Sequence, residues 1–320
     1  MPAVIGSSIE VARRFLQEGS LVAIPTETVY GLAGNALDAE AVARIFETKD
    51  RPRFDPLIVH VPSLERAKDY VKEIPGDAHA LAQRFWPGPL TLLLTKNETI
   101  PDLVTAGLDR VGLRCPDHPL TRQLLKELSF PLAAPSANPF GYVSPTTALH
   151  VYDQLGKKIP YILDGGPCSV GIESTILGWE DGKPVIYRLG GLDTEQIESV
   201  IGKVRIQSHS SSQPQAPGQL QSHYAPAKRF FLGNVDELIR RHQLKKPGIL
   251  TFKNKEITVP AHHLVLSPTG DLHEAARNLF GMLRELDRRD IDAVVAEEVR
   301  EEGLGRAIND RLRRAAADRH

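Results

Sequence analysis

The chain has 320 residues, and 39 Lys and Arg face 40 Asp and Glu, so the formal net charge is −1 at pH 7. This balance argues against a protein that coats nucleic acid, which needs a marked basic excess, and the length predicts two domains. Its two cysteines argue against a disulfide framework or a thiolate metal cluster. Because no apolar run approaches roughly 18 residues and no signal peptide is visible, we expect a cytoplasmic protein without a membrane span.

Short apolar runs alternate with helical patterns over the first 200 residues. A helix is predicted over 8–18, a strand over 21–24, and a second helix after Asp38, which is a typical cap. Further strands are predicted at 57–61, 89–95, 111–115, 131–134, 160–163, 173–178 and 184–188. Further helices are predicted at 63–71, 76–85, 117–127 and 193–201. Several of these strands are apolar on both faces, which is typical of a sheet covered by helices.

The composition changes at residues 207–222, which are rich in Ser, Gln, Pro and Gly, as in a linker. Strands are then predicted at 228–232, 247–251, 262–266 and 292–296, with helices at 234–243, 271–288 and 304–316. Repeated alternation of strands and helices predicts an open α/β sheet with helices packed on it. We therefore expect two α/β domains, at 1–205 and 228–320, joined by a linker at 206–227.

The usual signatures of nucleotide binding and covalent catalysis are missing from the sequence. It has no GxxxxGKS/T phosphate loop, no HExxH, no CxxC and no GxSxG elbow. The adjacent His262 and His263 lack helical ligand spacing, so surface or structural histidines are the better interpretation. A nucleotide enzyme with this sequence must hold phosphates with side chains and irregular backbone.

Two polar segments follow apolar strands early in the chain. Pro25-Thr26-Glu27-Thr28 stands where open α/β sheets bind ligands, although an ordinary strand-to-helix turn with threonine caps is the favoured interpretation of this segment alone. The segment 49–57 carries three cations, among them Lys49 and Arg51, between stiffening prolines. Such a loop suits polyphosphate or carboxylate binding, and a solvated run of charges is the equal alternative.

Arginines give the strand predicted at 111–115 a functional character. Alternation places Arg110, Gly112 and Arg114 on one face, and two arginines on one sheet face need an anionic partner or water. Cys115 points the other way and is expected to be a small core residue rather than a nucleophile.

Small and polar residues dominate two later loops and the linker. The segments 134–147 and 164–175 contain hydroxyls and glycines that let backbone amides approach a ligand. Ser144-Pro145 also has the pattern of a helix cap and first helical residue. His223 and Tyr224 are large side chains in a polar tether, so we expect this segment to pack on something, either as a lid or between the domains.

Taken together, these segments resemble the threonylcarbamoyl-AMP synthase family, in its long two-domain form with a YrdC-like catalytic domain. The resemblance covers nearly the whole chain, and the ending GLGRAINDRLRRAA also fits the family's C-terminal domain. The motifs occur in family order as PTETVYGLAG, KDRPRFDPL, WPGPLTLLL, APSANPFGYVSPT, GIESTI and HYAP. The resemblance implies an open twisted YrdC-like sheet domain followed by a smaller Rossmann-like α/β domain.

The resemblance implies a nucleotidyltransferase that makes L-threonylcarbamoyladenylate and pyrophosphate from L-threonine, bicarbonate and ATP. ATP would bring Mg²⁺ on its phosphates, with no metal ligands from the protein. A separate complex would transfer the threonylcarbamoyl group to adenosine 37 of certain tRNAs, and weak RNA binding stays open. Positioning and charge neutralisation would dominate catalysis, which agrees with the missing nucleophile.

Individual residues match the family's binding positions. The threonine-binding matches are Thr28, His60, Arg114, Ala134 through its backbone, and Ser174. The ATP-binding matches are Lys49, Arg51, Asp55, Arg110, Ser136, Ser144, Arg188 and Tyr224. Asp55 stands where we would expect asparagine, and an acid beside phosphates is unfavourable unless it contacts ribose, a donor or Mg²⁺.

Two other functions compete with this interpretation. A module for structured RNA would use a basic cleft, but the near-neutral charge and the lack of aromatic stacking motifs count against it. Carbamoyl transfer, as in hydrogenase-maturation proteins with related domains, would come with Cys-rich zinc segments that this sequence lacks.

Overall fold

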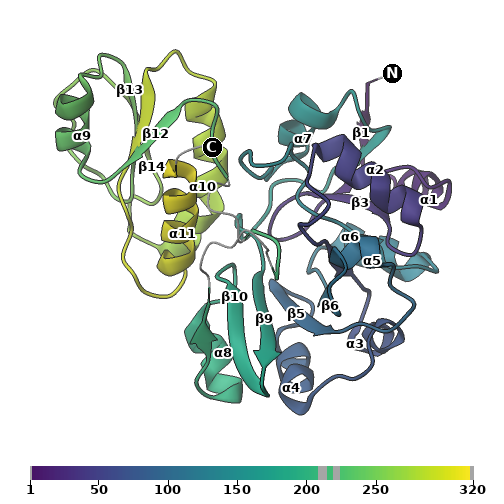
Figure 1. Ribbon diagram of the computed structural model, residues 1–320. Coiled ribbons are helices and arrows are strands. Elements are labelled where there is room, and N and C mark those ends of the chain that lie inside the picture. Colours follow the sequence, from purple (N-terminus) through teal and green to yellow (C-terminus); the bar gives the residue numbers. More distant parts are fainter. Residues whose placement is uncertain (1, 208–214, 219–223, 318–320) are drawn as a thin grey trace.

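The computed structural model describes residues 2–207, 215–218 and 224–317, and it divides into a larger and a smaller α/β body (Figure 1). The larger body contains, in chain order, β1 Val4–Gly6, α1 Ile9–Gln17, β2 Val22–Ile24, β3 Gly31–Asn35, α2 Ala39–Lys49, β4 Ile58–His60, α3 Leu64–Ala67, the 3-10 helix Lys68–Tyr70, α4 Gly76–Phe85, β5 Leu90–Thr95, α5 Asp102–Thr105, β6 Arg110–Arg114, α6 Pro119–Glu127, β7 Leu132–Ala133, α7 Ala148–Leu155, β8 Tyr161–Leu163, β9 Thr175–Glu180, β10 Lys183–Arg188, α8 Thr194–Ile201 and β11 Arg205–Ile206. The smaller body contains β12 Arg229–Leu232, α9 Val235–His242, β13 Pro247–Thr251, β14 His262–Val265, α10 Leu272–Asp287, β15 Ala293–Ala296 and α11 Gly305–Ala316.

Within the described residues, eleven strands of the larger body form one mixed sheet in the order β1-β8-β2-β3-β7-β4-β6-β5-β9-β10-β11. The central strands β4 and β6 run parallel, with His60 paired to Arg114, while β7 runs antiparallel to β4. This register places His60 of β4, Arg114 of β6 and the residues around Leu132 of β7 next to one another in the sheet.

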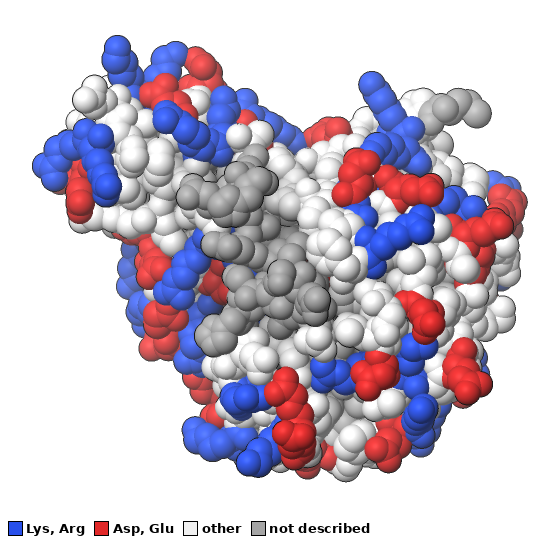
Figure 2. Space-filling view, viewed as in Figure 1, with Lys and Arg blue, Asp and Glu red and all other residues white. Residues whose placement is uncertain are grey.

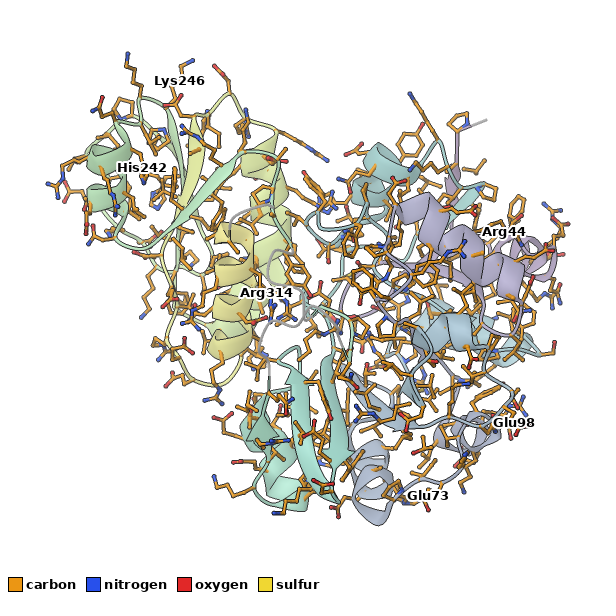
Figure 3. All side chains as sticks on the ribbon, in the orientation of Figure 1. Arg44, Glu73, Glu98, His242, Lys246 and Arg314 are labelled. Atoms are coloured by element: carbon orange, nitrogen blue, oxygen red, sulfur yellow. The ribbon has the colours of Figure 1, made fainter. Side chains whose placement is uncertain are left out.

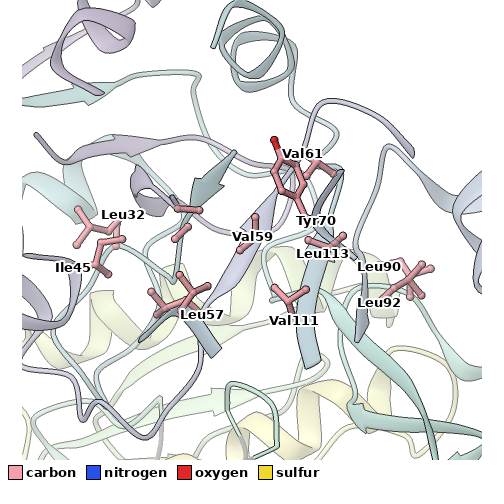
Figure 4. Close-up of a cluster of buried hydrophobic side chains, with 14 of the residues drawn as sticks. Leu32, Ile45, Leu57, Val59, Val61, Tyr70, Leu90, Leu92, Val111 and Leu113 are labelled. Carbon is pink, nitrogen blue, oxygen red and sulfur yellow. The ribbon is translucent and has the colours of Figure 1, made fainter. Parts of the chain in front are cut away.

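Both faces of this sheet are buried, as the apolar strands predicted. One face carries Val59, Leu92 and Leu113 in the largest hydrophobic cluster, together with Ile45 of α2 (Figure 4). On the opposite face, α1 and α6 cover β2, β3 and β7. Farther along that face, a second cluster lies over β5, β9 and β10, and it includes Ala216 from the segment predicted as a linker.

The smaller body has a parallel four-stranded sheet in the order β12-β15-β13-β14. Helix α9 covers one face of this sheet, with Val235 and Ile239 packing on Ile249 and Val295. Helices α10 and α11 cover the other face and lie toward the larger body (Figure 1). The prediction of two α/β units, a large sheet domain and a smaller Rossmann-like one, is confirmed.

Several elements differ from those predicted. The segment interpreted as a turn after residue 24 continues into strand β3, where Gly31 and Leu32 pair antiparallel with β2. The strands β1 and β11 and the helix α5 have at most four residues, too few for a periodic pattern. The helix expected at Ser144-Pro145 begins instead at Ala148, because Thr147 caps it by accepting a hydrogen bond from His150 N at 3.2 Å.

Candidate functional site

A cavity lies over the sheet between the part covered by α1 and α6 and the cluster over β5, β9 and β10. Ile58 and His60, two residues apart on β4, both line it, so it opens over the sheet face as well as the strand end. Ala134, which belongs to the cluster under α1 and α6, lines one side. Pro217, Gly218 and Tyr224 line it from the linker.

All five residues that matched threonine-binding positions line this cavity: Thr28, His60, Arg114, Ala134 and Ser174. Their hydroxyls are held by neighbours, since Thr28 Oγ1 lies 2.8 Å from Thr26 Oγ1 and Ser174 Oγ lies 2.8 Å from Thr91 Oγ1. Four separate segments of the chain therefore supply polar groups to one place.

Arg114 is a buried cation at the end of β6. Its Nη2 lies 2.7 Å from Oε1 of Glu27, and its Nε donates to the carbonyl of Gly88 at 3.3 Å. Glu27 is itself held, because its Oε2 accepts the backbone N–H of Asp117 at 3.0 Å. These partners fix the direction of a guanidinium whose planar group suits carboxylate recognition.

His60 is a buried neutral histidine beside Arg114. Burial, followed by the charge of Arg114, lowers the pKa of His60 to about 3. Within the part of the chain that the structure describes, its Nδ1 has no hydrogen-bond partner. A buried polar atom without a partner is unfavourable, so this atom is suited to a polar group of a bound ligand.

Of the residues that matched ATP-binding positions, Arg51, Ser136, Arg188 and Tyr224 line the cavity. Arg188 Nε and Nη2 donate to the carbonyl of Ser174 at 3.0 and 2.9 Å. Arg51 Nη2 pairs with Asp55 Oδ2 at 2.9 Å, and its Nε donates to the backbone carbonyl of Asp55 at 3.1 Å. Burial lowers the pKa of both arginines, and two buried cations favour an anionic ligand.

Lys49, Asp55, Arg110 and Ser144 are not among the residues that line the cavity. Lys49 is buried and donates to the carbonyls of Ser136 and Asn138, so it braces the loop after β7. The pKa of Lys49 is lowered mainly by burial, and burial raises the pKa of Asp55. Lys49 and Asp55 stand directly behind wall residues, and their assignment to ATP stays a prediction.

Arg110 and Ser144 have other partners. Arg110 donates to Tyr187 Oη at 2.9 Å and to Gln215 Oε1 of the linker at 3.0 Å. Ser144 Oγ donates to Glu173 Oε1 at 2.5 Å. Their roles toward ATP stay predictions as well.

The linker contacts the larger body beside Arg188. Arg188 Nη1 donates to the carbonyl of Pro217 at 3.3 Å. Gly218 has φ +84°, and a Cβ there would lie 2.7 Å from Tyr224 Oη and 3.1 Å from Arg188 Cδ. Because only glycine adopts this backbone freely and leaves that space, Gly218 lets the linker approach Tyr224 and Arg188.

Tyr224 is buried, and its ring stacks on Phe280 of α10 with centroids 5.7 Å apart. The guanidinium carbon of Arg311 lies 4.9 Å from the centroid of the Tyr224 ring. The prediction that this segment packs on something holds for Tyr224, which contacts the cavity and the smaller body. His223 lies outside the described residues, and movement of the segment as a lid stays a prediction.

Neither cysteine has the character of a nucleophile. Burial raises the pKa of Cys115 to about 11 and that of Cys168 to about 12, whereas reactive thiols have lowered values. Over residues 2–207, 215–218 and 224–317, no group of three or more His, Cys, Asp or Glu side chains is arranged to hold a metal ion. No helix in these same ranges is long and apolar enough to cross a membrane.

Sequence reasoning singled out the site motifs but gave no role to Glu27, Glu173 or Arg311. Glu27 and Glu173 stand inside PTETVYG and GIESTI, and Arg311 stands inside GLGRAINDRLRRAA. A charged residue inside a site motif was the sequence feature that could have singled out each of these three residues. Their pairing across 87 or 138 positions of the chain (27 with 114, 173 with 311) is visible only in the folded structure.

Comparisons with known proteins agree along the whole chain. The Sua5, YciO and YrdC family model, described as "Telomere recombination", matches residues 14–190. A second model, "Threonylcarbamoyl-AMP synthase, C-terminal domain", matches residues 192–317. The match to this second model separates the chain from relatives that share only the first domain.

Curated and solved relatives extend over both domains. The chain is 44% identical to a threonylcarbamoyl-AMP synthase of Pyrococcus abyssi, covering 97% of this chain and 94% of that protein. It is 40% identical to the Bacillus subtilis threonylcarbamoyl-AMP synthase, over 97% and 93%. The crystal structure of P. abyssi Sua5 complexed with L-threonine matches with a TM-score of 0.91 and 42% identity over 98% of each chain. The chain therefore belongs to the threonylcarbamoyl-AMP synthase family, in its two-domain form.

Proposed function

We propose that the cavity binds L-threonine and ATP side by side and joins them through bicarbonate to give L-threonylcarbamoyladenylate. The observation that carries this proposal is the convergence of five threonine-matched and four ATP-matched residues on one cavity. The relatives bear the name of this activity, and one solved relative is complexed with L-threonine.

The threonine end of the cavity is the group around Arg114. Arg114 binds the substrate carboxylate, because Glu27 already orients the guanidinium from the other side. Thr28, Ser174 and the neutral His60 offer hydrogen-bonding groups for the substrate's amine and hydroxyl. A hydroxyl that is bound by buried polar groups is discriminated from a methyl group, since the methyl leaves those groups unpaired.

The ATP end lies around Arg51, Ser136, Arg188 and Tyr224. The threonine amine and bicarbonate give a carbamate with loss of water, and a carbamate oxygen then attacks the α-phosphorus of ATP. Pyrophosphate leaves with the electron pair of the broken P–O bond. Negative charge gathers on carbamate and phosphate, so the buried arginines stabilise the transition state without a covalent nucleophile.

Magnesium enters this scheme as part of the substrate Mg·ATP. The carboxylates nearest to the cavity, Glu27, Asp55 and Glu173, are each already paired with an arginine. Because these carboxylates are occupied by arginines, we expect Mg²⁺ to be coordinated mainly by the phosphate oxygens of ATP and by water, which is its usual coordination in nucleotide sites. The protein's own contribution is to hold the phosphates with Arg51 and Arg188.

The linker serves this chemistry by covering the cavity. Pro217, Gly218 and Tyr224 complete the wall that the sheet leaves open, and a mixed anhydride must be kept from water. The product then passes to a separate complex that modifies adenosine 37 of tRNA. On the face shown in Figure 2, positive and negative side chains are interspersed, so that face offers no continuous basic surface for an RNA backbone.

The test is product analysis with the purified full-length chain. Incubation with Mg·ATP, threonine and labelled bicarbonate should release pyrophosphate only when threonine is present and should yield a labelled adenylate. Omission of threonine is the control. Release of pyrophosphate that is independent of threonine, or an adenylate without the bicarbonate label, would contradict the proposal.

A further inference from the structure

Arg311 is a buried arginine of the smaller body that reaches into the wall of the cavity. It lies on α11, close to Arg314, which Figure 3 labels, and its side chain has no exposed surface. Its Nε pairs with Glu173 Oε2 at 2.9 Å, and its Nη2 donates to the carbonyl of Leu189 at 2.8 Å. Its guanidinium carbon stands 4.9 Å from the ring centroid of Tyr224. It therefore contacts two residues that line the cavity, Glu173 and Tyr224.

Glu173 is an acidic residue in a cavity whose lining also carries three arginines, Arg51, Arg114 and Arg188. Ser144 donates to one of its carboxylate oxygens at 2.5 Å, and Arg311 pairs with the other. Glu173 is also close enough to Arg188 to act on the pKa of that guanidinium. Within the described residues, no carboxylate oxygen comes within ion-pair distance of Arg188 itself.

The partners of Glu173 decide which anion Arg188 binds. A buried carboxylate that loses its cation is strongly unfavourable and turns to another cation within reach. Arg188 already donates to the carbonyl of Ser174, the residue next to Glu173, and both line the cavity. Without Arg311, Glu173 would therefore turn to Arg188, and an Arg188 paired with Glu173 no longer offers its charge to phosphate. The free carboxylate also repels a polyphosphate.

We propose that Arg311 is a positioning residue of the ATP end of the cavity. It holds Glu173 away from Arg188 and fixes the ring of Tyr224 from behind by a cation–π contact. Docking of the smaller body thereby sets the affinity of the cavity for the phosphates of ATP. This inference rests on the proposed function, since it concerns how tightly the same cavity binds ATP.

The experiment compares Arg311→Met with Arg306→Met in the full-length enzyme. Arg306 lies on the same helix and also pairs with a carboxylate of the larger body, Glu195, but neither residue is among those that line the cavity. Arg311→Met should raise the KM for ATP about tenfold or more, the scale for disrupting a buried charge pair. Arg306→Met should leave that KM within about twofold, and threonine affinity by calorimetry should stay unchanged in both.

A second variant separates positioning from mere loss of stability. Glu173→Gln combined with Arg311→Met removes the carboxylate that competes for Arg188, so it should recover most of the lost affinity for ATP. Arg311→Lys keeps a cation beside Glu173 and should stay within about threefold of the parent KM, which gives a result even if Arg311→Met does not fold.

Equal KM values for ATP in Arg311→Met and Arg306→Met would overturn the inference, as would a double variant no better than Arg311→Met. Failure of the proposed function is recognised separately. Pyrophosphate release that does not depend on threonine would count against the proposed function, whereas intact ATP binding in Arg188→Ala would remove only the assignment of Arg188 to the phosphates.

Discussion

Arg110 and Arg114 share one face of strand β6 but take different partners. Arg114 pairs with Glu27 and lines the cavity, whereas Arg110 contacts Tyr187 and Gln215 at the far end of the strand. Four residues along a strand span about 13 Å, so one short strand supports two separate sites. Arg114 is therefore the cation beside the threonine-matched residues, and Arg110 braces the linker.

Arg114→Ala should weaken threonine binding by about 2–4 kcal/mol, because a charged ligand group loses its partner in a cleft. Arg114→Lys should recover only part of the loss, since one ammonium does not reproduce a two-pronged contact. Calorimetric titration with threonine measures both.

The alanine variant also leaves Glu27 without its cation. Glu27→Gln combined with Arg114→Ala is the control, and it should retain the threonine defect while recovering stability. Unchanged threonine affinity in Arg114→Ala would remove the assignment of Arg114 to the carboxylate.

His60 makes folding stability depend on pH in a definite direction. Its pKa falls from an ordinary 6.5 to about 3 in the folded protein because burial and Arg114 disfavour the imidazolium. Below pH 6.5 the unfolded chain binds a proton that the folded chain does not. The contribution of His60 is thus complete above pH 6.5 and is lost as the pH falls toward 3.

Replacing His60 by Gln should flatten the pH dependence of the free energy of unfolding between pH 6.5 and 4. The difference in slope should be at most about 1.4 kcal/mol per pH unit, which corresponds to one proton. Urea unfolding at a series of pH values measures it. Parallel curves for the two proteins would show that His60 is protonated in the folded state. His150, whose pKa is also lowered, to about 4, remains in both proteins as a common background.

At the scale of elements, the sheet supplies one wall of the cavity, and two covers on the same face leave an interval between them. Helices α1 and α6 cover the face at β2, β3 and β7, and Ala216 of the linker packs in the cluster over β5, β9 and β10. The cavity occupies the interval between these covers. In this structure the described linker residues Pro217, Gly218 and Tyr224 form part of the wall that closes this interval.

Ala216→Arg should keep the linker from seating, because the site of its methyl group is fully buried and has no room for a guanidinium. We expect the KM for ATP to rise and the adenylate to be lost to hydrolysis, with a small change in the melting temperature. Steady-state kinetics and thermal unfolding measure the two effects. Ala227→Arg, at an exposed position of the same linker, is the matched control and should behave like the parent protein.

At the scale of the whole molecule, the smaller body is docked by buried and charged contacts together. Val29, Val143 and Ile172 of the larger body join the apolar cluster of α10 and α11. Arg284 of α10 donates to the carbonyls of Val143 and Ser144, and burial lowers the pKa of Arg284 to about 10. Gly171 lies against α10, where a Cβ would come within 2.4 Å of Arg277 Cα. The two bodies thus meet through the loops that also form the cavity.

A chain that ends after residue 207 should fold, because it retains all the strands that form the large sheet in the described structure. It should bind ATP poorly and release the adenylate to hydrolysis, since it lacks Tyr224, Gly218 and Arg311. Tyr224→Ala in the full chain should reproduce part of this defect, and it should also lower the melting temperature, because the ring is buried and stacks on Phe280. If the shortened chain showed full activity and unaltered ATP affinity, the linker would be a passive spacer.

Local pattern was enough to predict the class of fold and most of its elements. The apolar strands, the capped helices and the polar segment after residue 206 each follow from periods and compositions that short stretches carry by themselves. The grouping of Thr28, His60, Arg114, Ala134 and Ser174 as one set came instead from the resemblance to the family, since these residues are far apart in the chain. Strands as short as β1 and β11 were missed because two or three residues carry no period.

Only the tertiary structure decided which charges meet. Glu27 with Arg114 and Glu173 with Arg311 are pairs between distant segments, brought together by sheet order and by docking of α11. The structure also placed Lys49 and Asp55 behind the wall and Arg110 at the far end of its strand, although their residue types suited the cavity equally well. The physical reason is that the position of a residue in a strand determines from which face of the sheet its side chain projects. The partner of that side chain depends on which other elements pack against that face, and these come from elsewhere in the chain.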